Sequence, residues 1–236
     1  MSLLGASEIR ELASKLELNP SKGLGQNFVI DGNVCQRIVR QVEIKAGDIA
    51  LEIGPGLGSL SLAILESGAP LIAVEIDKRL ADQLPETVAL HDSDADLLVI
   101  NRDALELIDL PKLPTVLIAN LPYNVSVPVL LNLLERFPTL REGVVMVQAE
   151  VAERLAAKPG GKDYGVPSLK SSWWADLELA GNISRNIFIY DRLREVEQIS
   201  AHVRMIKKRN PELSVVCIDH LGLLRVRKTD NIAYAI

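Results

Sequence analysis

The stretch that most constrains the fold begins at Ile49, where a short apolar run leads directly into a cluster of glycines. Residues 49–53 read IALEI, with Glu52 as the single polar residue, and glycines follow at positions 54, 56 and 58. An apolar run that stops at closely spaced glycines predicts a buried strand followed by a tight loop. The next residues, Ser59–Glu66, are predicted to form a helix. This order of elements predicts one half of a nucleoside-binding α/β fold.

The glycine spacing distinguishes two kinds of nucleoside site. A dinucleotide site uses G-x-G-x-x-G, because a pyrophosphate must lie against the backbone at a helix N-terminus. Here the loop reads G-P-G-L-G, and Ser59 stands where the last dinucleotide glycine would fall. With Glu52, the E-x-G-x-G-x-G pattern resembles the first motif of S-adenosylmethionine-dependent methyltransferases. A NAD site is the alternative for this motif.

The methyltransferase resemblance assigns roles to the loop and to the second strand. It implies that the loop at Gly54 and Gly56 passes close to the amino-acid part of the cofactor. The second apolar run, Leu71–Val74, ends in Glu75, where the tip of the neighbouring parallel strand is expected. The acidic residue at this place in the family binds both ribose hydroxyls, and a single carboxylate can accept two hydrogen bonds.

A further signal follows the predicted strand Val116–Ala119, which ends in the tetrapeptide N-L-P-Y. Open α/β sheets bind their ligands at the carboxyl ends of the strands. The tetrapeptide resembles the [DNS]-P-P-[YFW] signatures of enzymes that methylate an amine conjugated to a ring. The resemblance implies that the Asn120 side-chain oxygen and the Pro122 carbonyl accept the amine's two N–H bonds, and that Tyr123 stacks on the base. The alternative is a turn asparagine and a core tyrosine.

The segment Pro20–Asp31, PSKGLGQNFVID, supplies a fourth motif. It resembles the P-x-K-x-x-G-Q-N-F-L-x-D motif of ribosomal RNA adenine N6-dimethyltransferases, and the helix expected at Gly32–Val42 matches one in that family. The motifs EIGPGLG, VEID and NLPYN follow in the family's order and at its spacing. Residues 1–188 are therefore similar to the small-subunit ribosomal RNA adenine N6-dimethyltransferase family. The large-subunit resistance methyltransferases are the nearest alternative.

The resemblance, carried over by position, implies a set of site residues. The implied cofactor contacts are Asn27, Val29, Gly54, Gly56, Glu75, Asp103 and Asn120. The implied catalytic residues are Asn120, Pro122, Tyr123 and Phe188. Asp103 follows the predicted strand Leu98–Ile100, and its carboxylate would accept the amino group of the cofactor's adenine. An N-cap before a helix at Ala104–Ile108 is the alternative for Asp103. Phe188 would form the second aromatic face of the base pocket.

The remaining patterns predict further elements on both sides of these motifs. Helices are expected at Glu8–Leu16, Val125–Phe137, Ala149–Lys158 and Pro167–Leu177, and strands at Gly143–Gln148 and Asn182–Phe188. Ser7 is expected to cap the first helix. The acidic stretch Pro85–Asp96 is expected to be a solvated loop, and Pro159–Gly165 a flexible one. Trp173 and Trp174 are expected to lie on a helix and to serve packing.

The family resemblance stops after Phe188. The family continues with W-P-x-P-x-V-x-S, a last strand and a small helical domain for RNA, and this chain does not. Glu195–Arg209 has helical spacing, and the apolar run Ser214–Ile218, closed by Asp219, resembles the second ATPase motif of bacterial replicative DNA helicases. The sequence has no P-loop, so Asp219 is not expected to support ATP hydrolysis.

Residues 189–236 are therefore interpreted as a foreign helix-strand unit joined to a methyltransferase domain at residues 1–188, of which 1–47 form a helical N-terminal segment. Addition of this strand to the sheet through a right-handed crossover stays open. A hairpin strand, which methyltransferases normally have, is not expected.

Composition and charge limit the partners. Residues 1–188 hold 17 Lys and Arg against 25 Asp and Glu, and residues 189–236 hold 9 against 6. RNA affinity depends largely on neutralising phosphates, so an acidic body is expected to bind RNA weakly by itself. The sequence has two cysteines and three histidines, and their positions predict no metal site. Without a membrane span or a signal-peptide core, a cytoplasmic protein with no membrane partner is expected.

The sequence thus predicts an α/β fold with a Rossmann-like S-adenosylmethionine-dependent methyltransferase sheet covered by helices on both faces. The predicted function is dimethylation of adenosine N6 in small-subunit ribosomal RNA or the immature small subunit, with S-adenosylmethionine as cofactor. Two alternatives stay open. One is a chimera that binds S-adenosylmethionine without RNA methylation, and the other is an ATPase-related DNA-binding protein.

Overall fold

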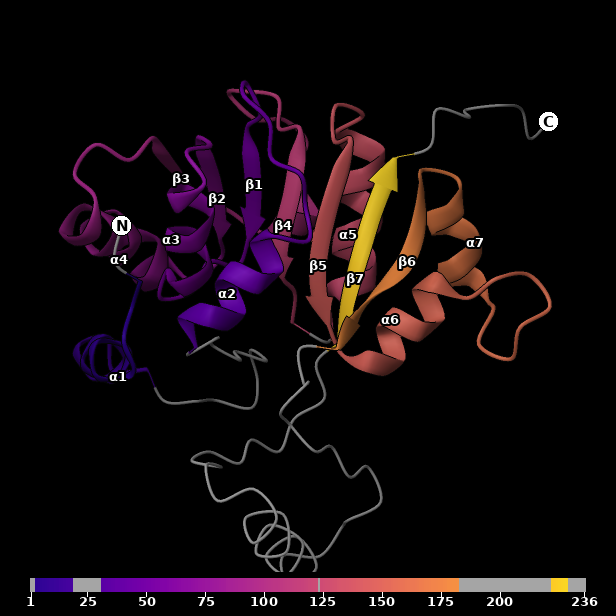
Figure 1. The fold of residues 1–236 in the computed structure, drawn as a ribbon, viewed down its shortest axis with the longest axis horizontal. Helices are drawn as coiled ribbons and strands as arrows, with labels where there is room; N and C mark the ends of the chain where they lie inside the picture. The colour runs from indigo at the N-terminus through magenta and orange to yellow at the C-terminus, as the bar shows by residue number, and fades with distance from the viewer. Residues whose placement is uncertain (1–2, 19–30, 123, 183–221, 229–236) are drawn as a thin grey trace, which may run out of the picture.

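The computed structural model describes residues 3–18, 31–122, 124–182 and 222–228, and the structural statements below refer to these residues. They form a central seven-stranded sheet with helices packed on both faces (Figure 1). The strands are β1 Ala50–Ile53, β2 Leu71–Glu75, β3 Leu97–Asn101, β4 Val116–Asn120, β5 Glu142–Val147, β6 Ala175–Asn182 and β7 Gly222–Lys228. The helices are α1 Ala6–Lys15, α2 Gly32–Val39, α3 Ser59–Glu66, α4 Lys78–His91, the short 3-10 helix η1 Ala104–Glu106, α5 Ser126–Arg136, α6 Ala149–Ala156 and α7 Val166–Ser172.

The strand order is β3-β2-β1-β4-β5-β7-β6. Strands β1 to β5 are parallel, and β7 lies antiparallel between β5 and β6. The order reverses between β1 and β4, which is the switch point where doubly wound sheets bind ligands. The carboxyl ends of β1 to β5 lie at the bottom of Figure 1.

Strand residues alternate between two hydrophobic clusters, one on each face of the sheet. In β1, Ala50 belongs to the first cluster, whereas Leu51 and Ile53 belong to the second. Residues of α1 to α4 complete the first cluster, and residues of α5 and α6 complete the second. The period of two along each strand fills both clusters at once, as a parallel sheet buried on both faces requires.

The expectation that no hairpin strand completes the sheet is wrong. Among the described residues, the C-terminal segment contributes β7 to the sheet, and this strand pairs antiparallel with both β5 and β6. Its sequence, GLLRVRK, was not predicted as a strand, because apolar and charged residues alternate over only four positions, 224–227. The predicted strand Ser214–Ile218 and the predicted helix Glu195–Arg209 lie outside the described residues.

The predicted loop Pro85–Asp96 is also wrong over most of its length, because α4 continues to His91 with Pro85 inside it. A proline inside a helix costs about 3 kcal/mol. Here Leu80, Leu84 and Val88 lie one turn apart and are all buried in the first cluster. Burial of this face offsets the cost of the proline.

The region after α6 folds differently from the prediction as well. Helix α7 ends at Ser172, and β6 begins at Ala175, so Leu177 lies in a strand. Of the predicted strand Asn182–Phe188, only Asn182 is among the described residues, and it ends β6. Trp174 packs against the second cluster, as expected, but Trp173 is 53% exposed. Helix α7 is short because Ala175 and Leu177 lie in β6, where both side chains are buried in the second cluster.

Other helix ends differ by smaller amounts. Helix α1 begins at Ala6 with Gly5 as its N-cap, so Ser7 lies inside the helix and does not cap it. The Gly5 N–H is instead satisfied by the Glu8 carboxylate at 2.7 Å. Helix α2 ends at Val39, three residues before the predicted end, and the helix expected at 104–108 is a single 3-10 turn.

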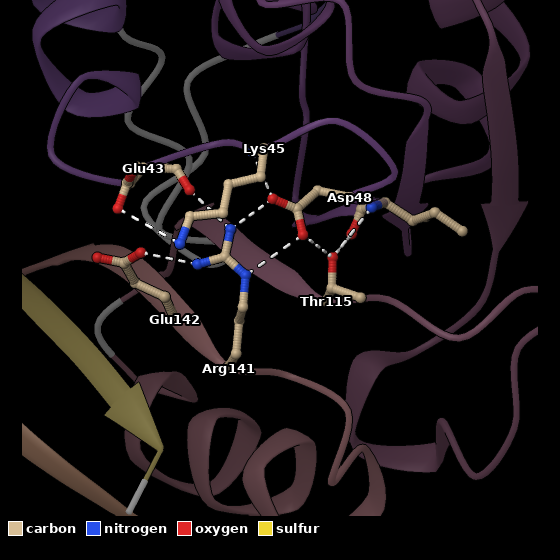
Figure 2. Close-up of polar contacts among 7 residues, drawn as sticks. Glu43, Lys45, Asp48, Thr115, Arg141 and Glu142 are labelled. Atoms are coloured by element: carbon tan, nitrogen blue, oxygen red, sulfur yellow. Dashed lines mark hydrogen bonds and ion pairs between the residues drawn. The ribbon is translucent and has the colours of Figure 1, made fainter.

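At the amino ends of β4 and β5, Arg141 joins three separate segments (Figure 2). Its guanidinium donates to both carboxylate oxygens of Asp48, to the Glu43 carbonyl at 2.6 Å and to the Glu142 carboxylate at 3.1 Å. Thr115 Oγ1 donates to Asp48 Oδ1 at 2.8 Å. We call Asp48, Thr115 and Arg141 the amino-edge clamp. It fastens the segment before β1 to β4 and β5.

Burial alone would raise the pKa of the Asp48 carboxyl. The hydrogen bonds from Arg141, the Lys45 N–H and Thr115 outweigh burial and lower the pKa of Asp48 to about 2. The clamp therefore holds an ionised carboxylate at neutral pH.

Candidate active site

The glycine-rich loop lies between β1 and α3, at the carboxyl edge of the sheet. Gly54, Gly56 and Gly58 have φ values of 69°, 59° and 98°, which side chains other than glycine rarely adopt. The Gly54 N–H donates to the Val74 carbonyl at 2.9 Å. A Cβ on Gly58 would also lie 2.8 Å from Leu84 Cδ1. The predicted strand, loop and helix are confirmed, and the glycines are required by the backbone.

Glu75 ends β2 beside this loop and is 5% exposed. Its two carboxylate oxygens accept from the Gly56 N–H at 3.1 Å and from the Asp77 N–H at 2.9 Å. Burial raises the pKa of Glu75, and the N–H groups of Asp77 and Gly56 oppose that shift. The carboxylate thus faces the loop, and each of its oxygens has capacity for a second hydrogen-bond donor.

Asn120 ends β4, which is the neighbour of β1 on the other side, and Pro122 follows the strand. A Cβ on Gly54 would lie 3.7 Å from the Asn120 carbonyl oxygen, so the two strand tips are in contact. Asn120 and Pro122 are half-buried, and the Pro122 carbonyl accepts the Val125 N–H at 3.2 Å. A carbonyl oxygen has two lone pairs, so this bond leaves capacity for one more donor.

Asp103 lies just past the carboxyl end of β3, on the far side of β2. Its Oδ1 accepts the Leu105 N–H at 2.9 Å, so the capping alternative for this residue is realised at η1. The strand order β3-β2-β1-β4 therefore brings Asp103, Glu75, Gly54 and Asn120 to successive strand tips along one edge.

Four predicted site residues lie outside the described residues: Asn27, Val29, Tyr123 and Phe188. Their roles stay predictions. Within the described part of the chain, no cluster of His, Cys, Asp and Glu is arranged to hold a metal ion, and no helix is long and apolar enough to span a membrane. Cys35 is fully buried, as expected of a core thiol, and burial raises its pKa to about 12.

Sequence reasoning included Glu52 in the glycine motif but missed its contacts, and it missed Ile76 altogether. Glu52 is completely buried in β1 and accepts the Ser61 hydroxyl at 2.6 Å, which ties the strand before the loop to the helix after it. Burial raises the pKa of Glu52 to about 8, Ser61 opposes the shift and Glu75 adds to it. Ile76 follows Glu75 and is 59% exposed. An acidic residue inside an apolar run and an isoleucine after a strand tip were the available signals.

Comparison with known families decides the assignment. Residues 18–221 match the family described as ribosomal RNA adenine dimethylase. The match includes the glycine-rich loop, Glu75, Asp103 and Asn120, and it extends well past residue 188.

The chain belongs to the ribosomal RNA adenine dimethylase family.

Similar members of the family are bacterial. The chain is 57% identical over 190 residues to the ribosomal RNA small subunit methyltransferase A of Leifsonia xyli, a match that covers 80% of this chain and 68% of the relative. It is 54% identical over 190 residues to the protein of the same name from Streptomyces griseus, covering 79% and 65%. The chain therefore spans about two thirds of the length of these relatives.

Solved structures share the fold of this family member. A dimethyladenosine transferase from Plasmodium falciparum aligns with a TM-score of 0.61 and 23% identity over 85% of this chain and 62% of that chain. The 23S rRNA methyltransferase ErmE also gives a TM-score of 0.61 and 23% identity, over 86% and 70%. The predicted Rossmann-like methyltransferase fold is confirmed.

Proposed function

We propose that this protein is an S-adenosylmethionine-dependent methyltransferase that dimethylates the N6 of adenosines in small-subunit ribosomal RNA. One observation carries the proposal. The glycine-rich loop, a buried carboxylate and residues Asn120, Leu121 and Pro122 lie at three adjacent strand tips of a sheet with the methyltransferase strand order. The 57% identity to a small-subunit methyltransferase adds the RNA class.

The residues at the edge suit S-adenosylmethionine. Glu75 is a buried acceptor with capacity for the two hydroxyls of a ribose, and hydrogen bonds to a charged acceptor contribute about 1.5 to 3 kcal/mol each. The glycines at 54 and 56 remove side chains where the backbone must approach a ligand closely. Ile76 offers an exposed apolar surface next to Glu75, against which a purine can pack. Asn27 and Val29 are proposed to add contacts from the N-terminal segment.

The chain's task in the reaction is chiefly to position the amine. When bound, S-adenosylmethionine supplies a methyl group attached to a positively charged sulfur. After transfer of the methyl group, the sulfur is part of a neutral thioether, which is a good leaving group. The Asn120 side-chain oxygen and the Pro122 carbonyl are proposed to accept the two N–H bonds of the adenine amine, which turns its lone pair toward that methyl. Oriented proximity of this kind supplies roughly 7 to 11 kcal/mol.

The target adenosine must leave its stack to reach this edge, as in other base-modifying enzymes. Tyr123 and Phe188 are proposed to hold the extruded base between them. Stacking on an aromatic side chain contributes about 1 to 3 kcal/mol per base. Small-subunit ribosomal RNA, within an immature subunit, is the proposed substrate.

A second candidate is a protein that binds S-adenosylmethionine without methylating RNA. The acidic balance of residues 1–188 favours it, because RNA binding needs phosphate neutralisation. This candidate includes the proposal that residues 189–236 are a separate unit similar to part of a helicase. The family match to residue 221 and the place of β7 inside the sheet speak for continuity instead. An ATPase role has only the likeness of the tail in its favour.

The test is transfer of a labelled methyl group to immature small ribosomal subunits by the parent chain and by Asn120→Ala. We expect the parent to methylate and Asn120→Ala to lose activity while binding S-adenosylmethionine more weakly but measurably. Asn120→Asp keeps an acceptor oxygen and is expected to fall between the two. Full activity of Asn120→Ala would refute the role of Asn120. Calorimetric binding of ATP but not S-adenosylmethionine would refute the proposed function itself.

A further inference from the structure

Two asparagines outside the predicted site hold the backbone that carries Glu75 and Asp103. The first is Asn101, the last residue of β3. Its Nδ2 donates to the Glu75 carbonyl at 2.8 Å and to the Ile76 carbonyl at 3.1 Å. The Arg102 N–H donates to the Glu75 carbonyl as well, at 3.1 Å. The turn after β2 is thus fixed from β3 by three hydrogen bonds.

The second is Asn132, in the middle of α5. Its Nδ2 donates to the Ala104 carbonyl at 3.0 Å and to the Leu107 carbonyl at 3.3 Å. Asparagine is unfavourable inside a helix, because its side chain competes for backbone hydrogen bonds. Here the side chain instead satisfies both ends of the turn that begins at Asp103, and Ala104 and Leu107 are buried beside it.

Both amides therefore act on neighbouring parts of one edge. Asn101 fixes the backbone of the proposed ribose acceptor, and Asn132 fixes the turn that directly follows the proposed adenine acceptor. A nucleoside that bonds to both carboxylates needs them at a set separation. A separation that is set before binding avoids the entropy cost of ordering them in the complex.

We infer that Asn101 and Asn132 are positioning residues for the nucleoside part of the cofactor, acting through Glu75 and Asp103. This inference rests on the proposed function. It assigns no contact between either asparagine and the cofactor. The competing reading is that both amides only stabilise the fold.

The experiment is calorimetric titration of the full chain and its variants with S-adenosylhomocysteine and with methylthioadenosine, which lacks the amino-acid part. Asn101→Ala and Asn132→Leu each remove two hydrogen bonds. We expect each to weaken both ligands about tenfold, which corresponds to about 1.4 kcal/mol. Asn101→Ser, which keeps a short donor, replaces Asn101→Ala if that variant does not fold.

Thr139→Val is the matched control. Thr139 Oγ1 donates to the Pro114 carbonyl at 2.7 Å, so this variant also removes a bond from a side chain to a carbonyl, but just before β5, at the amino edge. We expect a lower melting temperature and unchanged affinity for both ligands.

The outcomes separate the two proposals. If the parent binds both ligands and the asparagine variants lower only the melting temperature, as Thr139→Val does, the positioning role is overturned and the proposed function stands. A loss confined to S-adenosylhomocysteine would also overturn it, because the nucleoside contacts would then be intact. A parent that binds neither ligand overturns the proposed function, and the positioning role with it.

Discussion

The buried carboxyl groups at the two edges of the sheet have pKa values shifted in opposite directions. At the amino edge, Asp48 is paired with a guanidinium, and the hydrogen bonds around it lower its pKa to about 2 despite burial. At the carboxyl edge, Glu75 accepts main-chain N–H groups, Glu52 accepts a hydroxyl, and burial raises the pKa of both. No lysine or arginine in the described part of the chain forms an ion pair with either glutamate.

The difference indicates which edge is built for a ligand. A carboxylate whose two oxygens both accept from a guanidinium already has a charged partner, so it stabilises the fold and gains little from a ligand. A buried carboxylate held only by N–H groups is under-compensated, and a ligand that brings hydroxyl donors improves its environment. The amino edge is therefore expected to control stability, and the carboxyl edge to control ligand binding.

The largest expected effect is at Glu75. Glu75→Ala removes the proposed acceptor of both ribose hydroxyls, and two bonds to a charged acceptor are together worth at least about 3 kcal/mol, or roughly 100-fold in affinity. Titration with S-adenosylhomocysteine measures the loss, and thermal unfolding is expected to change little. Unchanged affinity would remove the distinction between the edges.

Arg141→Met is the counterpart at the amino edge. Removing one partner of a buried ion pair costs 3 to 5 kcal/mol in general, but the Arg141 side chain is 33% exposed, so we expect roughly 2 kcal/mol. Urea unfolding measures the change in the free energy of unfolding. Affinity for S-adenosylhomocysteine should stay within twofold of the parent, and a tenfold loss would show that the edges are not independent.

The pKa of Asp48 predicts an acid dependence of the same clamp. Because the folded-state pKa is lowered, the carboxylate stabilises the protein above about pH 4, its usual range, and this contribution is lost as the pH falls toward about 2. The difference in unfolding free energy between the parent and Asp48→Asn should therefore shrink between those values. A constant difference across the range would contradict the lowered pKa.

The pH dependence expected at Glu52 has the opposite sign. Its folded-state pKa is raised to about 8, so its favourable contribution is present at low pH and is lost as the pH rises through that value. Glu52→Gln cannot ionise. Its melting temperature relative to the parent should rise steadily from about pH 5 to about pH 8, as followed by circular dichroism.

The first half of the sheet was predictable because its signals are local. The apolar run at β1 ends in glycines, and β2 and β4 end in polar residues that the fold places side by side. The same locality gave the positions of Gly54, Glu75, Asp103 and Asn120, although their roles stay proposals.

The elements and residues that were not predicted depend on contacts between residues distant in sequence. Helix α4 runs through Pro85 because Leu80, Leu84 and Val88 find the first cluster, which a local proline signal does not reveal. Strand β7 is set by two antiparallel partners, β5 and β6, and its own alternation of charged and apolar residues is weak. Asn101 and Asn132 bond to carbonyls 25 to 28 positions away, so no local pattern marks them.

The place of the nucleoside can be observed in a crystal structure of the chain with S-adenosylhomocysteine. We expect both ribose hydroxyls to bond to the Glu75 carboxylate and the amino-acid part of the ligand to lie against the loop at Gly54 and Gly56. A ligand that binds in solution but is found away from these strand tips, with Glu75 in contact only with the Gly56 and Asp77 N–H groups, would contradict this expectation.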